Sequence, residues 1–495
     1  MVATDRALPA LSCVVLLASC AVGPDYHPRT TAELGVPDQW SVSPVQVKGE
    51  DLTAWWRRFD DPVLGQLVEQ AAAHNLDVAQ AVARLRQARE QLVIARSSLY
   101  PTLSGSASAS RNQTLRGGRE MEVLPDGTVT TATKSGVNTY ALGLDAAYQL
   151  DLFGGVRRSV ESARASYEGA GFDQAATLIS VQSETARNYV LVRAAQARLE
   201  NARASLAIQD DNLEIAGFRV QAGLVSSLDV EQARASRAQT AASMAPIEQA
   251  YNAAVSRLGI LTGQAPGALK ALLAAPRQIP TGPKAIGIGV PANLLRERPD
   301  VRSAERALGA ATARIGVAEA QLYPNLSLAG VLNTDAAPAF GGLFDTITGA
   351  VFARINQQIF DAGARRAEVR SRRAAADAAF SAYRATILTA LEDVENAVVA
   401  LTTAEERERE FAIAYDAARN SALIARSQYR TGLSDFLTLN TQEAALVSAR
   451  DGLVQARSDE ATALIALYVA LGGGWDSTTI PTASSSANSP PETKP

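Results

Sequence analysis

The feature that most constrains this chain is an internal duplication. Residues 75–104 align without a gap with residues 298–327, which lie 223 positions further along the chain. Asp77 then matches Asp300, and the Leu-Tyr-Pro run at 99–101 matches the same run at 322–324. Self-similarity of this kind predicts that one structural unit is built twice. The architecture can therefore be worked out from a single copy.

Within each copy, apolar positions recur at alternating intervals of three and four residues, which predicts a helix with a heptad seam. Many seam residues are small, so neighbouring helices can approach closely and a packed helical wall is expected. Each seam ends at Tyr-Pro, where proline stops the helix. The seam residues are Val78, Ala81, Leu85, Ala88, Leu92, Ala95 and Leu99, and then Val301, Ala304, Leu308, Ala311, Ile315, Ala318 and Leu322.

After each proline the alternation changes to a period of two, which predicts strands. The first copy predicts a hairpin at about 102–150, with residues 116–136 as its loop, and the second a weaker hairpin at about 326–361. The residues expected on one face are Leu103, Gly105, Ala107, Ala109, Tyr140, Leu142, Leu144, Ala146 and Tyr148, and then Leu326, Leu328, Gly330, Val351, Ala353 and Ile355.

Four strands cannot close a barrel, and an open sheet in lipid leaves edge groups unpaired at a cost of several kcal/mol each. No run of about 18 apolar residues could form a spanning helix, so any membrane crossing must use strands. We therefore expect a transmembrane barrel that is shared between chains. A soluble sandwich would alternate in the same way, and the strand pattern alone leaves that alternative open.

Long segments without proline follow the strands, from Gly154 to Ala245 and from Ala339 to Ile480. Helix formers dominate both segments, and residues 157–222 alone would extend roughly 100 Å as a helix. Each segment is interrupted once, at residues 221–224 and at residues 430–433. Glycine there can end one helix, and polar residues can cap the next. These interruptions predict the tips of two helical hairpins, at the ends farthest from the strands.

The N-terminus predicts an exported lipoprotein. Residues 1–19 have the character of a short export signal, and Leu17-Ala18-Ser19-Cys20 has the form of a lipobox. Cleavage would leave Cys20 as an acylated N-terminus, and several acyl chains hold a protein stably on a membrane. Ala21 after the cysteine indicates sorting to the outer membrane. A chance cysteine after a hydrophobic run is the alternative.

The cysteines, the histidines and the net charge argue against an enzyme. Cys13 would leave with the signal and Cys20 would carry lipid, so no thiolate site is expected. Two histidines, His27 and His74, are too few for a histidine-based zinc site or a Ser-His-Asp triad. The net charge of −4 is spread over mixed acidic and basic residues, which argues against a nucleic-acid partner. We expect no metal, no catalytic residue and no cofactor other than covalent lipid on Cys20.

Four short motifs, together with the duplication, resemble the outer membrane factor family of tripartite efflux systems. The resemblance covers nearly the whole chain and lies closest to the lipoprotein branch similar to OprM and NodT, with TolC as a more distant relative. The motifs are Cys20-Ala21-Val22-Gly23-Pro24-Asp25-Tyr26 with Pro28, Trp55-Trp56-Arg57-Arg58-Phe59-Asp60-Asp61-Pro62, Gln428-Tyr429-Arg430-Thr431-Gly432, and Leu471-Gly472-Gly473-Gly474-Trp475.

The resemblance implies a mainly α-helical homotrimer with transmembrane β-structure. Twelve strands would form an outer-membrane barrel, and twelve helices would continue it as a periplasmic α-barrel. The partners implied are outer-membrane lipid, a periplasmic adaptor and an inner-membrane transporter of the resistance-nodulation-division type. The expected division is a signal at 1–19, a lipidated equatorial segment at 20–62, a first repeat at 63–262, an equatorial linker at 263–292, a second repeat at 293–474, and a tail at 475–495 with a disordered end.

The resemblance also places a periplasmic gate at the helical tips. Asp229 matches a gate carboxylate of the family and Tyr429 a gate tyrosine, while Arg430 and Asp435 are candidates for interchain ion pairs. Asn440 and Thr441 stand where relatives commonly have an aspartate, which weakens the case for a fully ionic gate. The residues expected to contact the adaptor are Gly223, Leu224, Gly432 and Leu433.

Three other functions remain open at this stage. A type I secretion duct would share the architecture, although the lipobox favours the efflux branch. A structural envelope lipoprotein would carry similar coiled-coil arms. An enzyme acting on envelope polymers could use a carboxylate pair such as Asp60 and Asp61, but their place in an N-terminal motif favours a structural role. The sequence does not name a transported substrate.

Overall fold

The computed structural model describes residues 21–41, 52–113, 115, 119–123, 125, 127–133, 137–283, 297–337 and 340–476. The predicted signal, the lipobox with Cys20, residues 284–292 of the equatorial linker and most of the tail lie outside these residues. The chain divides into two compact units, which are described separately. One comprises Met1–His27, Ala88–Ser166 and Leu308–Ala379, and the other Pro28–Gln87, Tyr167–Ala307 and Phe380–Pro495.

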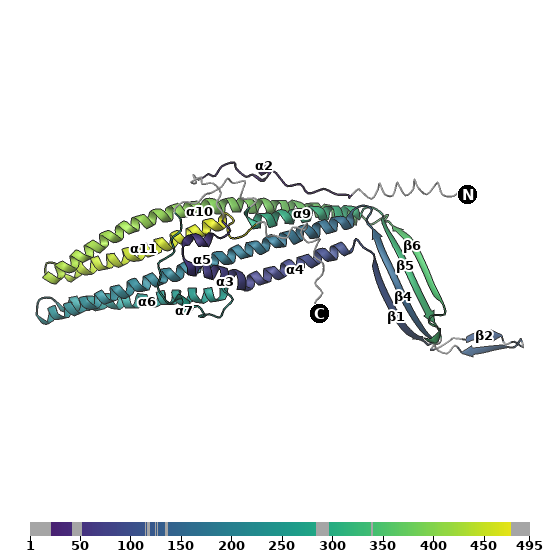
Figure 1. Ribbon diagram of the computed structural model, residues 1–495, viewed down its shortest axis with the longest axis horizontal. Helices are drawn as coiled ribbons and strands as arrows, with labels where there is room; N and C mark the ends of the chain where they lie inside the picture. The colour runs from purple at the N-terminus through teal and green to yellow at the C-terminus, as the bar shows by residue number, and fades with distance from the viewer. Residues whose placement is uncertain are drawn as a thin grey trace. The chain divides into compact units, whose positions relative to one another are not determined.

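The first unit contains a four-stranded antiparallel sheet in the order β1-β4-β5-β6 (Figure 1). Its strands are β1 (Thr102–Asn112), β4 (Val137–Leu150), β5 (Asn325–Ala336) and β6 (Ile347–Asn356). The two predicted hairpins are thus joined side by side, because β4 of the first pairs with β5 of the second. In the described part of the chain, β1 and β6 form the two edges of this sheet.

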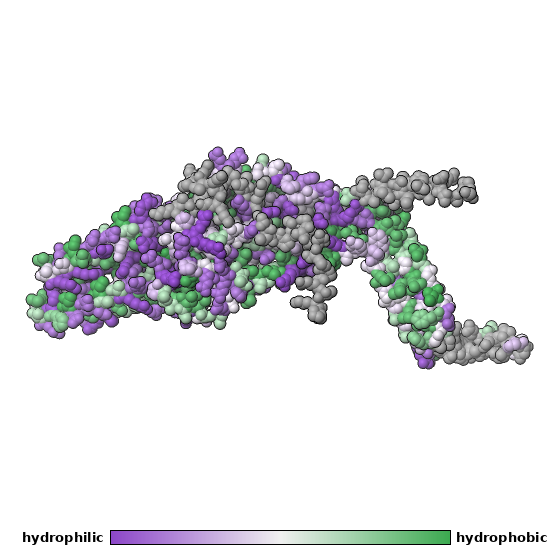
Figure 2. Space-filling model, viewed as in Figure 1, coloured by the Kyte–Doolittle hydropathy of each residue, from purple (hydrophilic) through white to green (hydrophobic). Residues whose placement is uncertain are grey.

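The strand register separates apolar from polar side chains. Leu103 lies opposite Ala146, Leu144 opposite Leu332, and Gly330 opposite Val351, so the residues predicted to share a face do share it. Figure 2 shows hydrophobic side chains gathered over these strands. The opposite face carries Ser104, Ser106, Asp145, Asn333 and Arg354. One face therefore suits lipid, and the other suits water.

The segment expected to be a loop between β1 and β4 contains a second sheet. Strands β2 (Arg119–Val123) and β3 (Val129–Thr133) pair antiparallel, so the expectation of a simple loop at 116–136 was wrong. The reason is that β3 is rich in Val and Thr, which favour strands, and that Gly127 adopts a φ of 86° in the turn. The corresponding connection between β5 and β6 contains the 3₁₀ helix η2 (Phe340–Gly342) instead.

Long helices make up most of the described chain. The first copy has α4 (Leu76–Ser97), α5 (Gly155–Gln221) and α6 (Ser227–Leu261), and the second has α9 (Pro299–Ala320), α10 (Ala364–Thr431) and α11 (Phe436–Ala470). Helix α6 continues through Pro246. None of the described helices is both long and apolar enough to span a bilayer. The predicted heptad seams on α4 and α9 are buried or half-buried along their whole length.

The shorter elements gather in the second unit, where they cover the long helices. They are α2 (Thr31–Leu34), the 3₁₀ helix η1 (Trp55–Phe59), α3 (Pro62–His74) and α7 (Lys270–Leu273). Trp55 is fully buried and stacks on Tyr468 of α11 at 5.6 Å between ring centroids. The Trp-Trp motif therefore anchors the N-terminal segment to the helices.

The two carboxylates considered as a possible catalytic pair, Asp60 and Asp61, lie at the start of α3. Asp61 caps α3 by accepting hydrogen bonds from the backbone N–H groups of Val63 and Leu64, and it accepts a further bond of 2.6 Å from the Tyr189 hydroxyl. Burial, followed by the bond to Asp61, raises the pKa of Tyr189. Asp60 occupies the left-handed turn before the helix, with a φ of 49°.

Candidate functional site at the tips of the helical hairpins

The two helical hairpins end in tips with the same backbone, and both tips lie at the same end of the second unit (Figure 1). At the first tip, Gly223 has a φ of 71°, and the N–H of Leu224 donates to the carbonyl of Arg219 at 2.9 Å. At the second tip, Gly432 has a φ of 78°, and the N–H of Leu433 donates to the carbonyl of Gln428 at 2.8 Å. Glycine is favoured here because this helix ending needs a left-handed residue.

Each tip has a leucine whose side chain is exposed to solvent. Leu224 is 69% exposed and Leu433 is 80% exposed. Water solvates an exposed leucine side chain poorly, so burying it against another protein surface is favourable. The predicted adaptor-contacting residues are therefore placed where a partner can reach them.

The helices that follow the tips are capped differently. Ser226 caps α6 by accepting from the N–H of Leu228 at 3.2 Å. Asp435 caps α11 by accepting from the N–H of Thr438 at 2.8 Å. The hydrogen bonds with Thr438 lower the pKa of Asp435. Asp435, predicted as a partner for an interchain ion pair, thus also has a local role in this chain.

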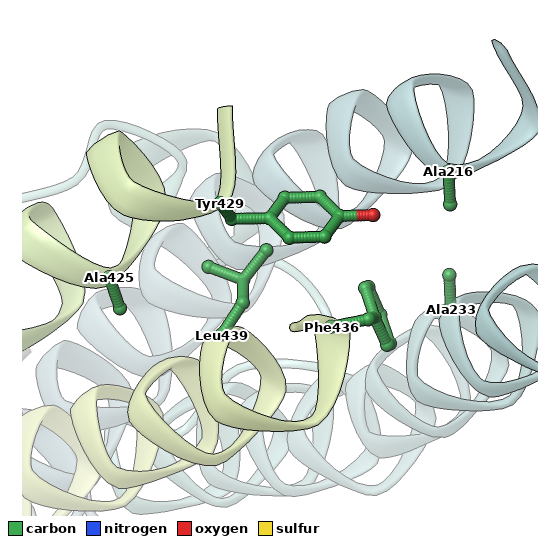
Figure 3. Close-up of a cluster of buried hydrophobic side chains, with 6 residues drawn as sticks. All are labelled: Ala216, Ala233, Ala425, Tyr429, Phe436 and Leu439. Carbon is green, nitrogen blue, oxygen red and sulfur yellow. The ribbon is translucent and has the colours of Figure 1, made fainter. Parts of the chain in front are cut away.

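A small hydrophobic cluster joins the two hairpins just behind their tips (Figure 3). The second hairpin supplies Tyr429, Phe436 and Leu439, and the rings of Tyr429 and Phe436 meet edge to face at 5.9 Å. The first hairpin supplies the small residues Ala216 and Ala233. The aromatic rings and Leu439 of the second hairpin therefore fill a socket of the first, in which Ala216 and Ala233 lie beside the partly buried Leu213, Ile215 and Val230.

Tyr429 is the centre of this contact, and Arg219 of α5 holds it from the other hairpin. The Arg219 guanidinium lies over the Tyr429 ring at 4.7 Å and donates a hydrogen bond of 2.9 Å to the Tyr429 carbonyl. The Tyr429 side chain is 1% exposed, and its hydroxyl has no hydrogen-bond partner among the described residues. Burial raises the pKa of Tyr429; Arg219 opposes that shift and Asp229 adds to it.

Arg219 was missed by sequence reasoning. Basic residues are common in the last turn of any helix because they interact favourably with its dipole, so nothing in the sequence distinguishes this arginine from others. Its role emerges only when the second hairpin brings Tyr429 over it. We call the set Arg219, Tyr429, Phe436, Ala216 and Ala233 the tip latch.

The other predicted gate residues lie around the tip latch without forming one network. Asn440 accepts a hydrogen bond of 2.7 Å from Ser236, which is a second link between the hairpins. Thr441 donates to the carbonyl of Leu437 in its own helix. Asp229 is half-exposed in the first turn of α6, and Arg430 is exposed. Within the described residues, neither Arg430 nor Asp435 forms an ion pair.

Two further polar links were not expected from the sequence. Arg426 and Glu443 form an ion pair within the second hairpin, where Glu443 is buried and one of the bonds is 2.8 Å long. Farther from the tips, Arg198 of α5 pairs with Asp451 of α11 at 2.6 Å. This pair lines a cavity of about 590 Å³ between α5, α6 and α11.

The side chains at the tips are apolar, aromatic and ionic. Residues 216–236 and 425–443 include no histidine and no cysteine. In the part of the chain that the structure describes, no group of three or more His, Cys, Asp or Glu residues could hold a metal ion. What the site offers is two hairpins with matching surfaces, joined by an aromatic side chain, a cation and a few hydrogen bonds.

Comparisons with known proteins give a consistent picture. The family described as outer membrane efflux protein matches residues 67–264 and 290–473. The chain is 30% identical over 466 residues to nodulation protein T of Rhizobium leguminosarum bv. trifolii, covering 93% of this chain and 96% of that protein.

Solved structures with a similar fold include outer-membrane channels. The chain is similar to the outer-membrane channel OprN, with a TM-score of 0.81 and 36% identity over 92% of this chain and all of that one. It is also similar to the open state of the MtrE outer membrane channel of Neisseria gonorrhoeae, with a TM-score of 0.78 and 26% identity over 92% of this chain and 98% of that one.

Proposed function

Since this chain belongs to the outer membrane efflux protein family and is an outer-membrane efflux channel, we propose that it forms a trimeric duct whose periplasmic end is gated by the tip latch. The family is one of channels and transport, not of enzymes. The observation that carries the gate proposal is the Tyr429 side chain of one hairpin, buried in the socket of the other and held there by Arg219.

The sheet supports assembly of several copies. Its edge strands β1 and β6 run antiparallel to each other in a four-stranded sheet, so β6 of one copy can continue the same antiparallel pattern with β1 of the next. Ring closure removes the unpaired edges, which lipid does not tolerate. Three copies give twelve strands, with the leucine-rich face toward lipid and the serine-rich face toward the lumen.

The tip latch supports a gate with two states. In the closed state the two hairpins of each copy are held together by Tyr429, Arg219 and the Ser236–Asn440 hydrogen bond. A partner shifts such an equilibrium only if it binds the open state better than the closed one. The exposed Leu224 and Leu433 at the tips are the surfaces through which an adaptor would do so. Asp229, Arg430 and Asp435 remain available for contacts between copies.

The partners and the anchor complete the proposal. Channels of this kind work with an adaptor and an inner-membrane transporter, and we assign the transporter to the resistance-nodulation-division type. Cys20 carries the lipid that attaches the chain to the outer membrane. The family resemblance and the lipobox support these assignments. The type I secretion duct and the structural lipoprotein have no comparable support.

A reversible lock between the hairpins tests the gate. Ser236→Cys with Asn440→Cys places two thiols where a 2.7 Å hydrogen bond now links the hairpins, in a mature chain otherwise free of thiols. In planar bilayers we expect low conductance from the oxidised protein and higher, fluctuating conductance after reduction. The two single variants serve as controls. Equal conductance before and after reduction, with the disulfide verified by mass, would contradict the gate.

A further inference from the structure

The segment that directly follows Cys20 is held in a slot within the first unit. The N–H of Val22 donates to the carbonyl of Phe153 at 3.1 Å, just before α5 begins. Arg158, in the first turns of α5, donates to the carbonyls of Val22 at 3.2 Å and Gly23 at 3.1 Å. Three hydrogen bonds thus tie this short stretch of backbone, which we call the strap (residues 21–25), to the start of α5.

Arg158 itself is built into the slot. Its side chain is 6% exposed, and it pairs with Asp25 of the strap at 2.7 Å and with Glu161 at 2.8 Å. A buried guanidinium is tolerated only when its charge and its donors are satisfied. Since the strap supplies one carboxylate and two carbonyls, Arg158 loses most of its partners if the strap leaves. The arginine and the strap therefore hold each other in place.

Three glycines lie at the contact between the strap and the rest of the first unit, and a Cβ atom on any of them would clash with a neighbour. A Cβ atom on Gly154, whose φ is 78°, would lie 2.6 Å from the Cα of Ala21. A Cβ atom on Gly23, whose φ is 95°, would lie 2.4 Å from the Cα of Gly316 of α9, and one on Gly316 would lie 2.9 Å from the Val22 carbonyl oxygen. These contacts come from three separate parts of the sequence. They show a slot fitted to one particular backbone.

We propose that Arg158 and the glycine-lined slot form a clamp that fixes the acylated N-terminus at the junction between strands and helices. The anchoring role rests on the proposed acylation of Cys20, whereas the clamp itself does not. Ala21 directly follows Cys20 in the sequence, so the clamp acts on the described residue next to the proposed site of acylation. Arg158 is thus a positioning residue for the lipid anchor.

The surroundings of the slot are those of a membrane–water boundary. Strand β4 ends at Leu150, three residues before Phe153. The Phe153 ring stacks on Tyr323 at 4.7 Å between centroids, beside the end of α9 and the start of β5. Aromatic side chains gather at such boundaries in membrane proteins. The clamp therefore brings the acyl chains to the level at which they can enter the bilayer.

Hydrogen exchange of the full-length protein, purified from membranes in detergent, tests the clamp. The Val22 amide is predicted to be protected in the wild type. Asp25→Asn removes a partner that is 71% exposed and leaves the helices intact, and Arg158→Gln removes the cation. We expect each variant to speed exchange of the strap at least tenfold. Arg164→Gln, an exposed arginine on the same helix, is the matched control and should change nothing.

Substitution of glycine gives an independent test. Gly316→Ala is expected to expel the strap in the same way, whereas Gly217→Ala, where an added Cβ meets nothing within 4 Å, is expected to leave it protected. Strap exchange that is unprotected in the wild type, or unchanged in Asp25→Asn, Arg158→Gln and Gly316→Ala, would overturn the clamp.

The mass of the intact protein separates the clamp from the acylation of Cys20. The wild type and the clamp variants should carry the mass of the lipid, and Cys20→Ala should lack it while keeping a protected strap. A protected strap in a wild type without lipid would support the clamp and overturn the anchoring role. Loss of strap protection in Cys20→Ala would show that lipid rather than Arg158 holds the strap, and would overturn the clamp.

Discussion

The two helical hairpins of this chain share a backbone and differ in what their tips contribute. Helices α5 and α10 have 67 and 68 residues, and α6 and α11 have 35 each. When Gly223 is aligned with Gly432, however, the buried Tyr429 corresponds to Val220 and Phe436 corresponds to Ser227. The second hairpin thus supplies the aromatic rings of the tip latch, and the first supplies the socket that receives them. Duplication gave two matching scaffolds, and side-chain divergence made them complementary.

The polar residues have diverged in the same manner. Arg219 of the first hairpin corresponds to Gln428 of the second, and the buried Glu443 corresponds to Arg234. The caps differ as well, because Ser226 corresponds to Asp435. Each difference can be removed by a single substitution. Substitution at Arg219 or Asp435 can make the hairpins alike, and substitution at Tyr429 or Glu443 removes a side chain that only the second hairpin has.

Removing the large side chain of the latch should have the greatest effect. Tyr429→Ala deletes a buried aromatic ring, a change that typically costs about 3–5 kcal/mol. We expect faster hydrogen exchange in both tips, since the socket loses its occupant. Tyr429→Phe is the control and should be nearly neutral, because the buried hydroxyl has no partner among the described residues. If hydrogen exchange becomes faster in the second tip alone, then Tyr429 does not hold both hairpins together.

Breaking the buried ion pair should destabilise the second hairpin alone. Glu443→Gln leaves Arg426 without its carboxylate, which we expect to cost about 2 kcal/mol or more because Glu443 is buried. The first hairpin offers a matched exposed pair, Arg237 with Asp210, for which Asp210→Asn should cost less than about 1 kcal/mol. Thermal unfolding of the two variants measures how much unfolding free energy each one loses. Equal losses would show that burial does not make the Arg426–Glu443 pair more stabilising than the Arg237–Asp210 pair.

Making the two hairpins alike at Arg219 should lower the stability of the tips by less than Tyr429→Ala does. Arg219→Gln introduces the residue of the second hairpin and removes the contact with the Tyr429 ring, at a cost of about 1 kcal/mol. The tips should then exchange faster than in the wild type and more slowly than in Tyr429→Ala. Arg219→Lys keeps the charge and should recover part of the loss. If Arg219→Gln has no effect on tip exchange, the cation is not part of the latch.

Lowering the pH should have the smallest effect on the stability of the tips, and this effect should appear only at the second tip. Hydrogen bonds with Thr438 lower the pKa of Asp435 below its ordinary value of 3.8. A lowered folded pKa means that the carboxylate stabilises the folded tip above pH 3.8, and that this contribution is lost as the pH falls through the folded value. The first tip has a serine cap and lacks this dependence. Asp435→Ser should abolish the difference, as measured by hydrogen exchange corrected for intrinsic rates.

Much of the fold could be predicted from the sequence because its patterns are long and periodic. The heptad seams ending at Tyr-Pro placed α4 and α9, and the period-two alternation placed four strands with the correct residues sharing a face. Glycines at 223 and 432 marked both tips, since a left-handed helix ending favours glycine. The strands β2 and β3 were missed because turn residues around them outweighed a short run of Val and Thr.

The candidate site was less accessible to sequence reasoning. Tyr429 and Asn440 were singled out through family resemblance, and both lie at contacts between the hairpins. Arg219, Ser236 and the Arg426–Glu443 pair were not, because each acquires its partner only when two distant helices meet. Arg158 was missed for the same reason, since its partner Asp25 lies more than 130 positions earlier. Contacts between residues far apart in sequence leave no local pattern to read.

Conductance of the purified channel in planar bilayers tests most directly whether the tip latch closes the duct. We predict that Tyr429→Ala opens to a larger and steadier conductance than the wild type, while Tyr429→Phe resembles the wild type. If both variants assemble normally and Tyr429→Ala conducts no more than the wild type, then the latch does not hold the channel closed.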